Sequence, residues 1–115
     1  MKLPNAENAV VAIEKLTDYC LSGDHPRGRH KARVLEAACG ITAENADVLM
    51  QALVEAAQQG EAIPQFRDEH GQRFIIEWRL TGPTGSAEIV TAWIVRKGED
   101  FPRFVSAYVR RESMR

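Results

Sequence analysis

The spacing of apolar residues along the chain changes near Gly60. Before this glycine, apolar residues recur at intervals of three and four positions, which places them on one face of an α-helix. After it, apolar and polar residues alternate, as they do on a β-strand with one buried face. We therefore predict helices in the first half of the chain and strands in the second.

Two helices are predicted before residue 40, following a short strand at residues 9–12. The first covers residues 13–21, where apolar residues follow helical spacing. The second covers residues 29–39 and ends at Gly40, because glycine is the usual C-terminal cap. The apolar face of the second helix is expected to contain Val34, Leu35 and Ala38.

A third helix is predicted between Thr42 and Gly60. The Thr42 hydroxyl suits an N-cap, and Glu44 adds an acid to the first turn, where the helix dipole is positive. The helix is expected to end at Gly60. Its buried face is predicted to consist of Ala46, Leu49, Leu53, Ala56 and Ala57.

Four antiparallel strands are predicted in the second half, separated by turn-forming sequences. The first lies at about residues 62–67, where Pro64 favours an edge position because proline cannot donate to a sheet ladder. The third, at residues 87–95, is apolar on both faces, as a central strand is, and the fourth covers residues 103–109. The second strand is expected to point Phe74, Ile76, Trp78 and Leu80 into the core.

These elements predict a single α+β domain over residues 1–115, with about three helices packed on one face of a roughly four-stranded antiparallel sheet. The 115-residue chain is 44% hydrophobic and 27% charged, which is typical of a globular protein. A core at this length buries about two thirds of the unfolded surface, so a stable fold requires neither a disulfide nor a metal.

The sequence carries no pattern typical of a membrane or secreted protein. The longest unbroken apolar run, residues 9–13, is far shorter than the roughly 20 residues of a membrane span. Residues 1–8 lack the apolar segment of a signal peptide. Cys20 and Cys39 fall in predicted helices without the spacing of a metal or redox motif. We expect reduced cysteines, no membrane association and a cytoplasmic location.

The densest group of candidate functional side chains surrounds the start of the second predicted helix. Each exposed cation in a first helical turn is disfavoured by roughly 0.3–1 kcal/mol, and a bound anion such as phosphate would offset this cost. The alternative is a solvated helix start whose cations pair with acids such as Glu36. The group consists of His25, Arg27, Arg29, His30, Lys31 and Arg33.

The predicted last strand carries a second group of polar residues. Strict alternation places Ser106, Tyr108 and Arg110 on one face together with Phe104, and these hydroxyls and this guanidinium suit a phosphodiester. The alternative is a tyrosine at a strand end whose ring packs and whose hydroxyl is solvated. The opposite face would hold Arg103, Val105, Ala107 and Val109.

Charge is segregated along a chain whose net charge is only −1. Residues 24–35 carry four cations against one acid, and residues 96–115 carry six against three. Residues 36–77 carry two cations against eight acids. Two basic segments that met in the fold would form a patch suited to nucleic acid, and chance segregation is the alternative.

No motif for a metal or a cofactor is present. The chain lacks HExxH, paired CxxC, P-loop and GxSxG sequences, and His25, His30 and His70 lack the spacing of metal ligands. We therefore predict neither a metal site nor a cofactor.

Residues 3–6, 14–19, 25–33 and 100–105 resemble an uncharacterised bacterial domain family of unknown function. Its members occur alone and at the ends of large secreted or phage-related proteins. The most specific segment is the His-Pro-x-Gly-x-x-Lys pattern at residues 25–31. This resemblance covers nearly the whole chain and implies no activity.

The order of elements is also similar to that of the barnase, EndoU, colicin and RelE group of ribonucleases, many of which are toxins. Residues 103–112 resemble the closing strand of RelE-like toxins. The chain departs from this group in charge, because such ribonucleases are usually strongly basic. A shared layout does not by itself determine a function.

This second similarity implies a small metal-independent ribonuclease or nuclease-like toxin domain. His30 or His25 would act as general base on the ribose 2′-hydroxyl, since an ordinary histidine titrates near neutral pH. Ser106 or Tyr108 would position the phosphate. The cations that would stabilise its charge are Lys31, Arg103 and Arg110, and those that would bind the substrate also include Arg27, Arg29 and Arg33.

The competing hypothesis is a non-catalytic protein-interaction module. The neutral net charge and the acidic third helix favour it. The partners predicted under the two hypotheses are RNA and a protein partner or inhibitor, and the sequence leaves both open.

Overall fold

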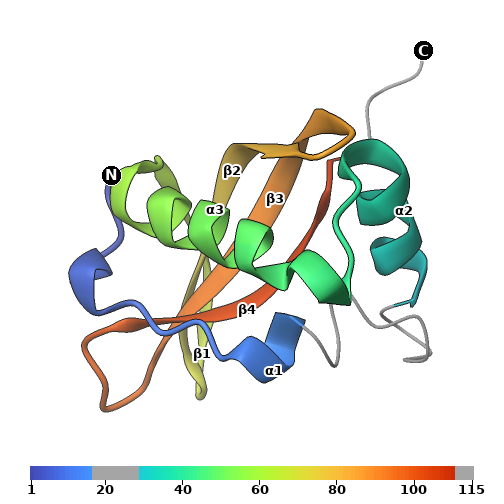
Figure 1. Ribbon diagram of the computed structural model, residues 1–115. Helices are drawn as coiled ribbons and strands as arrows, with labels where there is room; N and C mark the ends of the chain where they lie inside the picture. Colours follow the sequence, from blue (N-terminus) through green and yellow to red (C-terminus); the bar gives the residue numbers. More distant parts are fainter. Residues whose placement is uncertain (17–28, 111–115) are drawn as a thin grey trace.

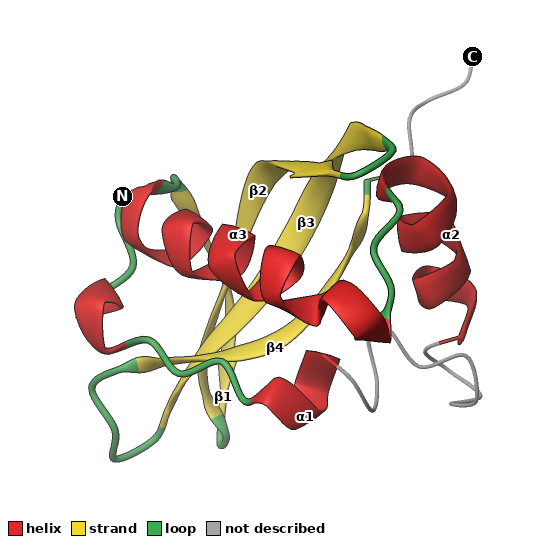
Figure 2. Ribbon diagram, in the orientation of Figure 1, coloured by secondary structure: helices red, strands yellow, loops and turns green. Residues whose placement is uncertain are grey.

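The computed structural model describes residues 1–16 and 29–110, with the backbone alone at Arg29 and His30. Helices cover one side of a single four-stranded antiparallel sheet (Figures 1 and 2). The strands follow each other in space as they do along the chain, which confirms the predicted α+β architecture. They are β1 (Ala62–Asp68), β2 (Gly71–Gly82), β3 (Gly85–Arg96) and β4 (Pro102–Val109).

The helix α3 (Ala46–Gln59) lies across the sheet (Figure 1). The first turn of the predicted helix is a 3-10 turn, η3 (Ala43–Asn45), which leads directly into α3. Thr42 and Asn45 cap this turn, because the Thr42 hydroxyl accepts a hydrogen bond from the backbone of Glu44 and the Asn45 side chain accepts one from the backbone of Thr42. The five residues predicted for its inner face are all buried. The periodicity of the sequence therefore predicts this helix and its orientation correctly.

The helix α2 (Arg29–Cys39) has the predicted bounds, and Gly40 follows it with a left-handed φ of 74°. Its most buried residues are Leu35 and Cys39, so its inner face is rotated slightly from the predicted one. Helix α1 (Ile13–Lys15) begins where predicted and is followed by the buried Leu16. Residues 17–21 of the predicted first helix lie outside the described residues.

The centre of the core is a hydrogen-bonded tryptophan on β3. Trp93 is fully buried, and its ring meets Phe104 of β4 edge-on, with the ring centroids 5.5 Å apart. Its indole N–H donates to the Thr91 hydroxyl at 2.8 Å, and that hydroxyl donates to the carbonyl of Ile76 at 2.9 Å. The single buried indole nitrogen is thus satisfied inside an apolar core, as a stable fold requires.

The predicted strand at residues 9–12 is a single parallel bridge in the structure. Val10 pairs with Arg103 at the outer edge of β4, where its N–H donates to Pro102 and its carbonyl accepts from Phe104, both at 2.9 Å. These two bonds fix the segment that leads into α1 beside β4. The strand is short because only this part of the segment runs along the edge.

A bulge in β4 changes which of its side chains share a face. Phe104 pairs with Trp93 and Ser106 pairs with Ala92, so Val105 is an additional residue between them. Phe104 consequently faces the core, whereas Ser106, Tyr108 and Arg110 face the opposite side. Arg103, which pairs with Ile94, joins that opposite side. The prediction from strict alternation was therefore wrong on two points. It placed Phe104 on the face of Ser106, and it placed Arg103 on the face opposite Ser106.

Candidate functional site

The basic start of α2 meets the polar strand β4. The ammonium nitrogen of Lys31 lies 5.1 Å from the centroid of the Tyr108 ring, which is a cation–π distance. Tyr108 is 37% exposed, so the pair lies at the surface. The fold thus brings together one residue from each of the two basic segments that the sequence places far apart.

The turn between β2 and β3 holds the other end of α2. The N–H of Thr84 donates to the carbonyl of Cys39 at 3.2 Å. At Gly82 a Cβ atom would lie only 2.2 Å from that same carbonyl oxygen, so a side chain here would push the helix away. The glycine allows the close contact that sets the position of α2 relative to the sheet.

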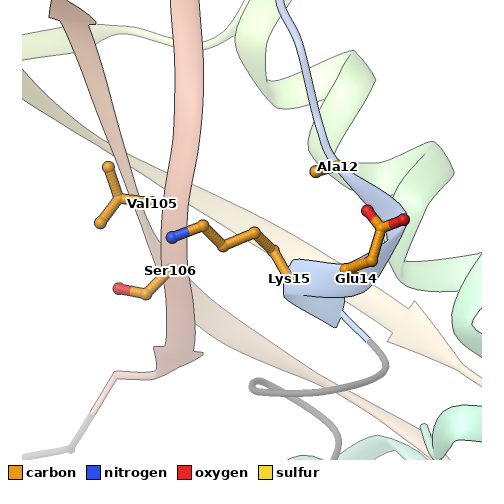
Figure 3. Close-up of a pocket in the computed structure, with 5 residues that line it drawn as sticks. All are labelled: Ala12, Glu14, Lys15, Val105 and Ser106. Atoms are coloured by element: carbon orange, nitrogen blue, oxygen red, sulfur yellow. The ribbon is translucent and has the colours of Figure 1, made fainter.

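An open hollow of about 470 Å³ lies between α1 and β4 (Figure 3). Lys15 extends from α1 toward β4, on the side where Ser106 lies, whereas the Glu14 carboxylate points away from the strand. Within residues 1–16 and 29–110, the residues that line it are Ala12, Glu14, Lys15, Val105 and Ser106.

Sequence reasoning missed Lys15 as a site residue. In the sequence it is an ordinary charged residue on the outer face of a predicted helix, and no local pattern distinguishes it. Only the parallel bridge between Val10 and Arg103 reveals that the segment carrying Lys15 runs beside β4.

Ser106 and Tyr108 lie on the same face of β4, because they pair with Ala92 and Val90, two alternate residues of β3. Lys15 and Ser106 line the same hollow, and Lys31 lies over the ring of Tyr108. We call these four residues, Lys15, Lys31, Ser106 and Tyr108, the β4 polar cluster. It offers two ammonium groups and two hydroxyls to an anion.

Arg103 of β4 and Arg110, which directly follows this strand, both form ion pairs. Both terminal oxygens of Glu99 accept hydrogen bonds from the Arg103 guanidinium, at 2.9 and 3.0 Å, and the guanidinium also stacks on Phe101 at 5.0 Å. This pair holds the pKa of the Glu99 carboxyl below its ordinary value and raises the pKa of Arg103. Arg110 lies 3.4 Å from a carboxylate oxygen of Glu77.

Several predicted site residues lie outside the described part of the structure. These include His25 and Arg27, and for Arg29 and His30 only the backbone is described, in the first turn of α2. His30 therefore precedes Lys31 directly in a helix whose start approaches β4. Arg33 is exposed on α2.

Three further observations concern metals, membranes and thiols. Among the described residues, no group of three His, Cys, Asp or Glu side chains is placed to hold a metal ion. None of the helices in residues 1–16 and 29–110 is long and apolar enough to cross a membrane.

Cys39 is a free, buried thiol. Its sulfur lies 3.8 Å from the Leu80 carbonyl oxygen, and burial raises the pKa of the thiol.

Comparison with solved structures finds a similar fold in a chain of a contact-dependent growth inhibition toxin–immunity protein complex from Klebsiella pneumoniae 342. The match has a TM-score of 0.62 at 17% identity and covers 88% of this chain and 99% of that chain. At this identity the likeness concerns the fold alone.

Among curated proteins, none matches this sequence. A family model does match, over residues 2–111, and it agrees with the resemblance carried by the His-Pro-x-Gly-x-x-Lys segment. On this match over nearly its entire length, the chain belongs to the domain of unknown function family DUF6883.

Proposed function

We propose that this chain is a metal-independent ribonuclease domain of the toxin type, whose substrate phosphate binds between the start of α2 and β4. The observation that carries the proposal is the contact between Lys31 and Tyr108, at 5.1 Å from ammonium to ring centroid. It joins two segments with cations and hydroxyls, which are the groups that bind a phosphodiester.

Each residue has a distinct role in this mechanism. His30, or His25, takes the proton from the ribose 2′-hydroxyl, whose oxygen then attacks the adjacent phosphorus atom. The P–O5′ bond breaks as the new bond forms, which leaves a 2′,3′-cyclic phosphate, and the departing 5′-oxygen takes a proton from solvent water. Lys31 stabilises the negative charge that develops on the phosphate oxygens, and Tyr108 or Ser106 positions the phosphate by hydrogen bonding. Arg27, Arg29 and Arg33 bind the neighbouring RNA backbone.

Arg103 and Arg110 have more limited roles in the proposed site. Arg103 would have to leave its paired hydrogen bonds with Glu99 to reach a phosphate. Arg110 has a single, longer contact with Glu77 and is half exposed, so it can turn toward RNA at smaller cost. Of these two arginines, Arg110 is therefore the better placed to contact the phosphate.

The fold similarity supports a toxin role and a protein partner. The similar chain comes from a complex of a toxin with an immunity protein. By analogy, we propose that a protein inhibitor covers the site of this chain until it reaches its RNA. Such an enzyme would act in the cytoplasm, where its RNA substrate lies.

The same comparison favours one second candidate, the non-catalytic interaction module. A chain of this fold is found in a complex with another protein, and the net charge of this chain is −1, which is unusual for a ribonuclease. The two functions differ in their effect on RNA, because the ribonuclease would cleave it and the interaction module would leave it intact.

The test uses purified protein and total RNA at low salt in the presence of EDTA. We expect cleavage that persists in EDTA, and the reaction should be lost in His30→Ala or, if His25 is the base, in His25→Ala. His70→Ala is the matched control, because His70 lies in the exposed turn between β1 and β2. Intact RNA with every preparation of the folded wild-type chain would overturn the ribonuclease proposal and favour the interaction module.

A further inference from the structure

The hollow between α1 and β4 has an apolar wall and a polar rim. Ala12 and Val105 supply methyl groups to the wall (Figure 3). The polar groups are the Lys15 ammonium, which extends toward β4, the Ser106 hydroxyl, and the Glu14 carboxylate, which points away from β4 (Figure 3). Within residues 1–16 and 29–110, no hydrogen bond or ion pair holds this ammonium group. A flat apolar group with an adjacent negative charge matches such a lining, and a nucleotide has both.

The β4 polar cluster repeats one combination of groups along the strand. Lys15 and Ser106 line the same hollow, and Lys31 lies over the ring of Tyr108, which carries the second hydroxyl. Residues two apart on a strand are separated by roughly 6.8 Å, which is comparable to the spacing of successive phosphates on an extended RNA strand. Two neighbouring phosphates can therefore bind along β4, with the base between them directed into the hollow.

We propose that Lys15 and Ser106 bind the nucleotide next to the cleaved phosphodiester, and that the substrate is consequently single-stranded RNA lying along β4. This inference rests on the proposed function for the identity of the first phosphate site at Lys31 and Tyr108. The strand must be unpaired because a base held in a duplex is stacked and paired, and cannot enter the hollow.

The test measures binding separately from cleavage. A fluorescent single-stranded RNA with methylated 2′-oxygens cannot be cleaved, because its nucleophile is blocked, and its binding is followed by anisotropy at several salt concentrations. Lys15→Gln removes one charge and keeps most of the side chain. Lys97→Gln, in the exposed turn between β3 and β4, removes the same charge away from the hollow.

We expect Lys15→Gln to weaken binding of the single strand roughly threefold and to lower the salt slope by about 0.7, the value for one phosphate contact on a single strand. Lys97→Gln should match the wild type. A double-stranded RNA of the same sequence should bind equally to wild type and Lys15→Gln. Equal loss in the two lysine variants, or an equal effect of Lys15→Gln on the duplex, would overturn this inference.

The outcomes also separate this inference from the proposed function. Binding that depends on Lys15, without cleavage of unmodified RNA, would overturn the ribonuclease and leave the nucleotide site. If Lys15→Gln cleaves RNA and binds the single strand as well as wild type does, the nucleotide site is overturned and the ribonuclease proposal stands. A wild-type chain that binds no RNA would overturn both.

Discussion

Helices α3 and α2 contact the sheet in different ways. Helix α3 buries five apolar residues at the spacing that its sequence predicts, and the 3-10 turn that leads into it is capped by Thr42 and Asn45. Helix α2 buries fewer residues, is held at its end by the turn between β2 and β3, and meets β4 through Lys31 and Tyr108. The α3 contact therefore provides stability, whereas the α2 contact positions charged groups.

The difference shows how this fold can carry a polar site at small cost. Apolar burial contributes about 25 cal/mol per Å², so a core like that around Trp93 supplies most of the free energy of folding. An exposed cation–π contact contributes only about 0.5–1 kcal/mol. The α2–β4 surface can thus hold polar residues that a core position would not tolerate.

The largest expected effect is in the core, at Trp93. Trp93→Ala should lower the free energy of unfolding by about 3–5 kcal/mol, because it leaves a cavity and removes the donor to the Thr91 hydroxyl. Trp78, which is only half-buried in the groove between α3 and β2, is the matched control, and Trp78→Ala should cost about 2 kcal/mol. Urea unfolding measures both, and equal losses would contradict the central role of Trp93.

The next effect is expected where α2 approaches the turn between β2 and β3. Gly82→Ala should cost about 1–3 kcal/mol, since its new methyl group would collide with the Cys39 carbonyl. The variant should also bind RNA more weakly, because α2 carries Lys31. Pro83→Ala, at the exposed neighbouring position, should change neither property. RNA affinity that is retained in folded Gly82→Ala would show that this contact does not position the site.

A smaller effect on stability is expected at the α2–β4 contact itself. Lys31→Ala should lower the free energy of unfolding by no more than about 1 kcal/mol. Its RNA affinity should nevertheless fall roughly threefold, with a lower salt slope. Tyr108→Phe keeps the ring under Lys31 and removes the hydroxyl, so it should retain stability and lose RNA affinity. A large loss of stability in Lys31→Ala would show that the Lys31–Tyr108 contact stabilises the fold instead of serving mainly to position charged groups.

The smallest effect is a pH dependence in the turn that precedes β4. Because the Arg103 guanidinium lowers the pKa of Glu99, the folded state favours the ionised carboxylate. This contribution is present above the ordinary glutamate pKa and is lost as pH falls through the lowered value in the folded state. Thermal melts of wild type should therefore decline more steeply on acidification than those of Arg103→Gln. Parallel melting curves for the two proteins would contradict this.

The comparison of the two helices also explains which parts of the fold are predictable from sequence. Helix α3, Gly40 and the inward residues Phe74 and Leu80 follow from local periodicity and capping, because each of these signals lies within a few residues. The edge position of β1 follows from Pro64. Trp78 is less buried than its inward direction predicts, because burial also depends on how far α3 extends over β2.

The candidate site was only partly predictable for a related reason. Lys31, Tyr108 and Ser106 are identifiable by residue type, but their proximity depends on contacts between segments more than 70 residues apart in the case of Lys31 and Tyr108. The β4 bulge, which moves Arg103 to the face of Ser106, has no marker such as a glycine in the sequence.

The sequence by itself determined the α+β class, the bounds of α2, the end of α3, the order of the strands along the chain and the core face of β2, since hydrophobic spacing and caps act locally. The tertiary structure alone decided that Lys15 and Ser106 line one hollow, that Lys31 lies over Tyr108 and that Arg103 shares a face of β4 with Ser106. These pairs depend on how whole elements pack, on a bridge at the sheet edge and on one additional residue in a strand. Such long-range geometry has no local signal in the order of the amino acids.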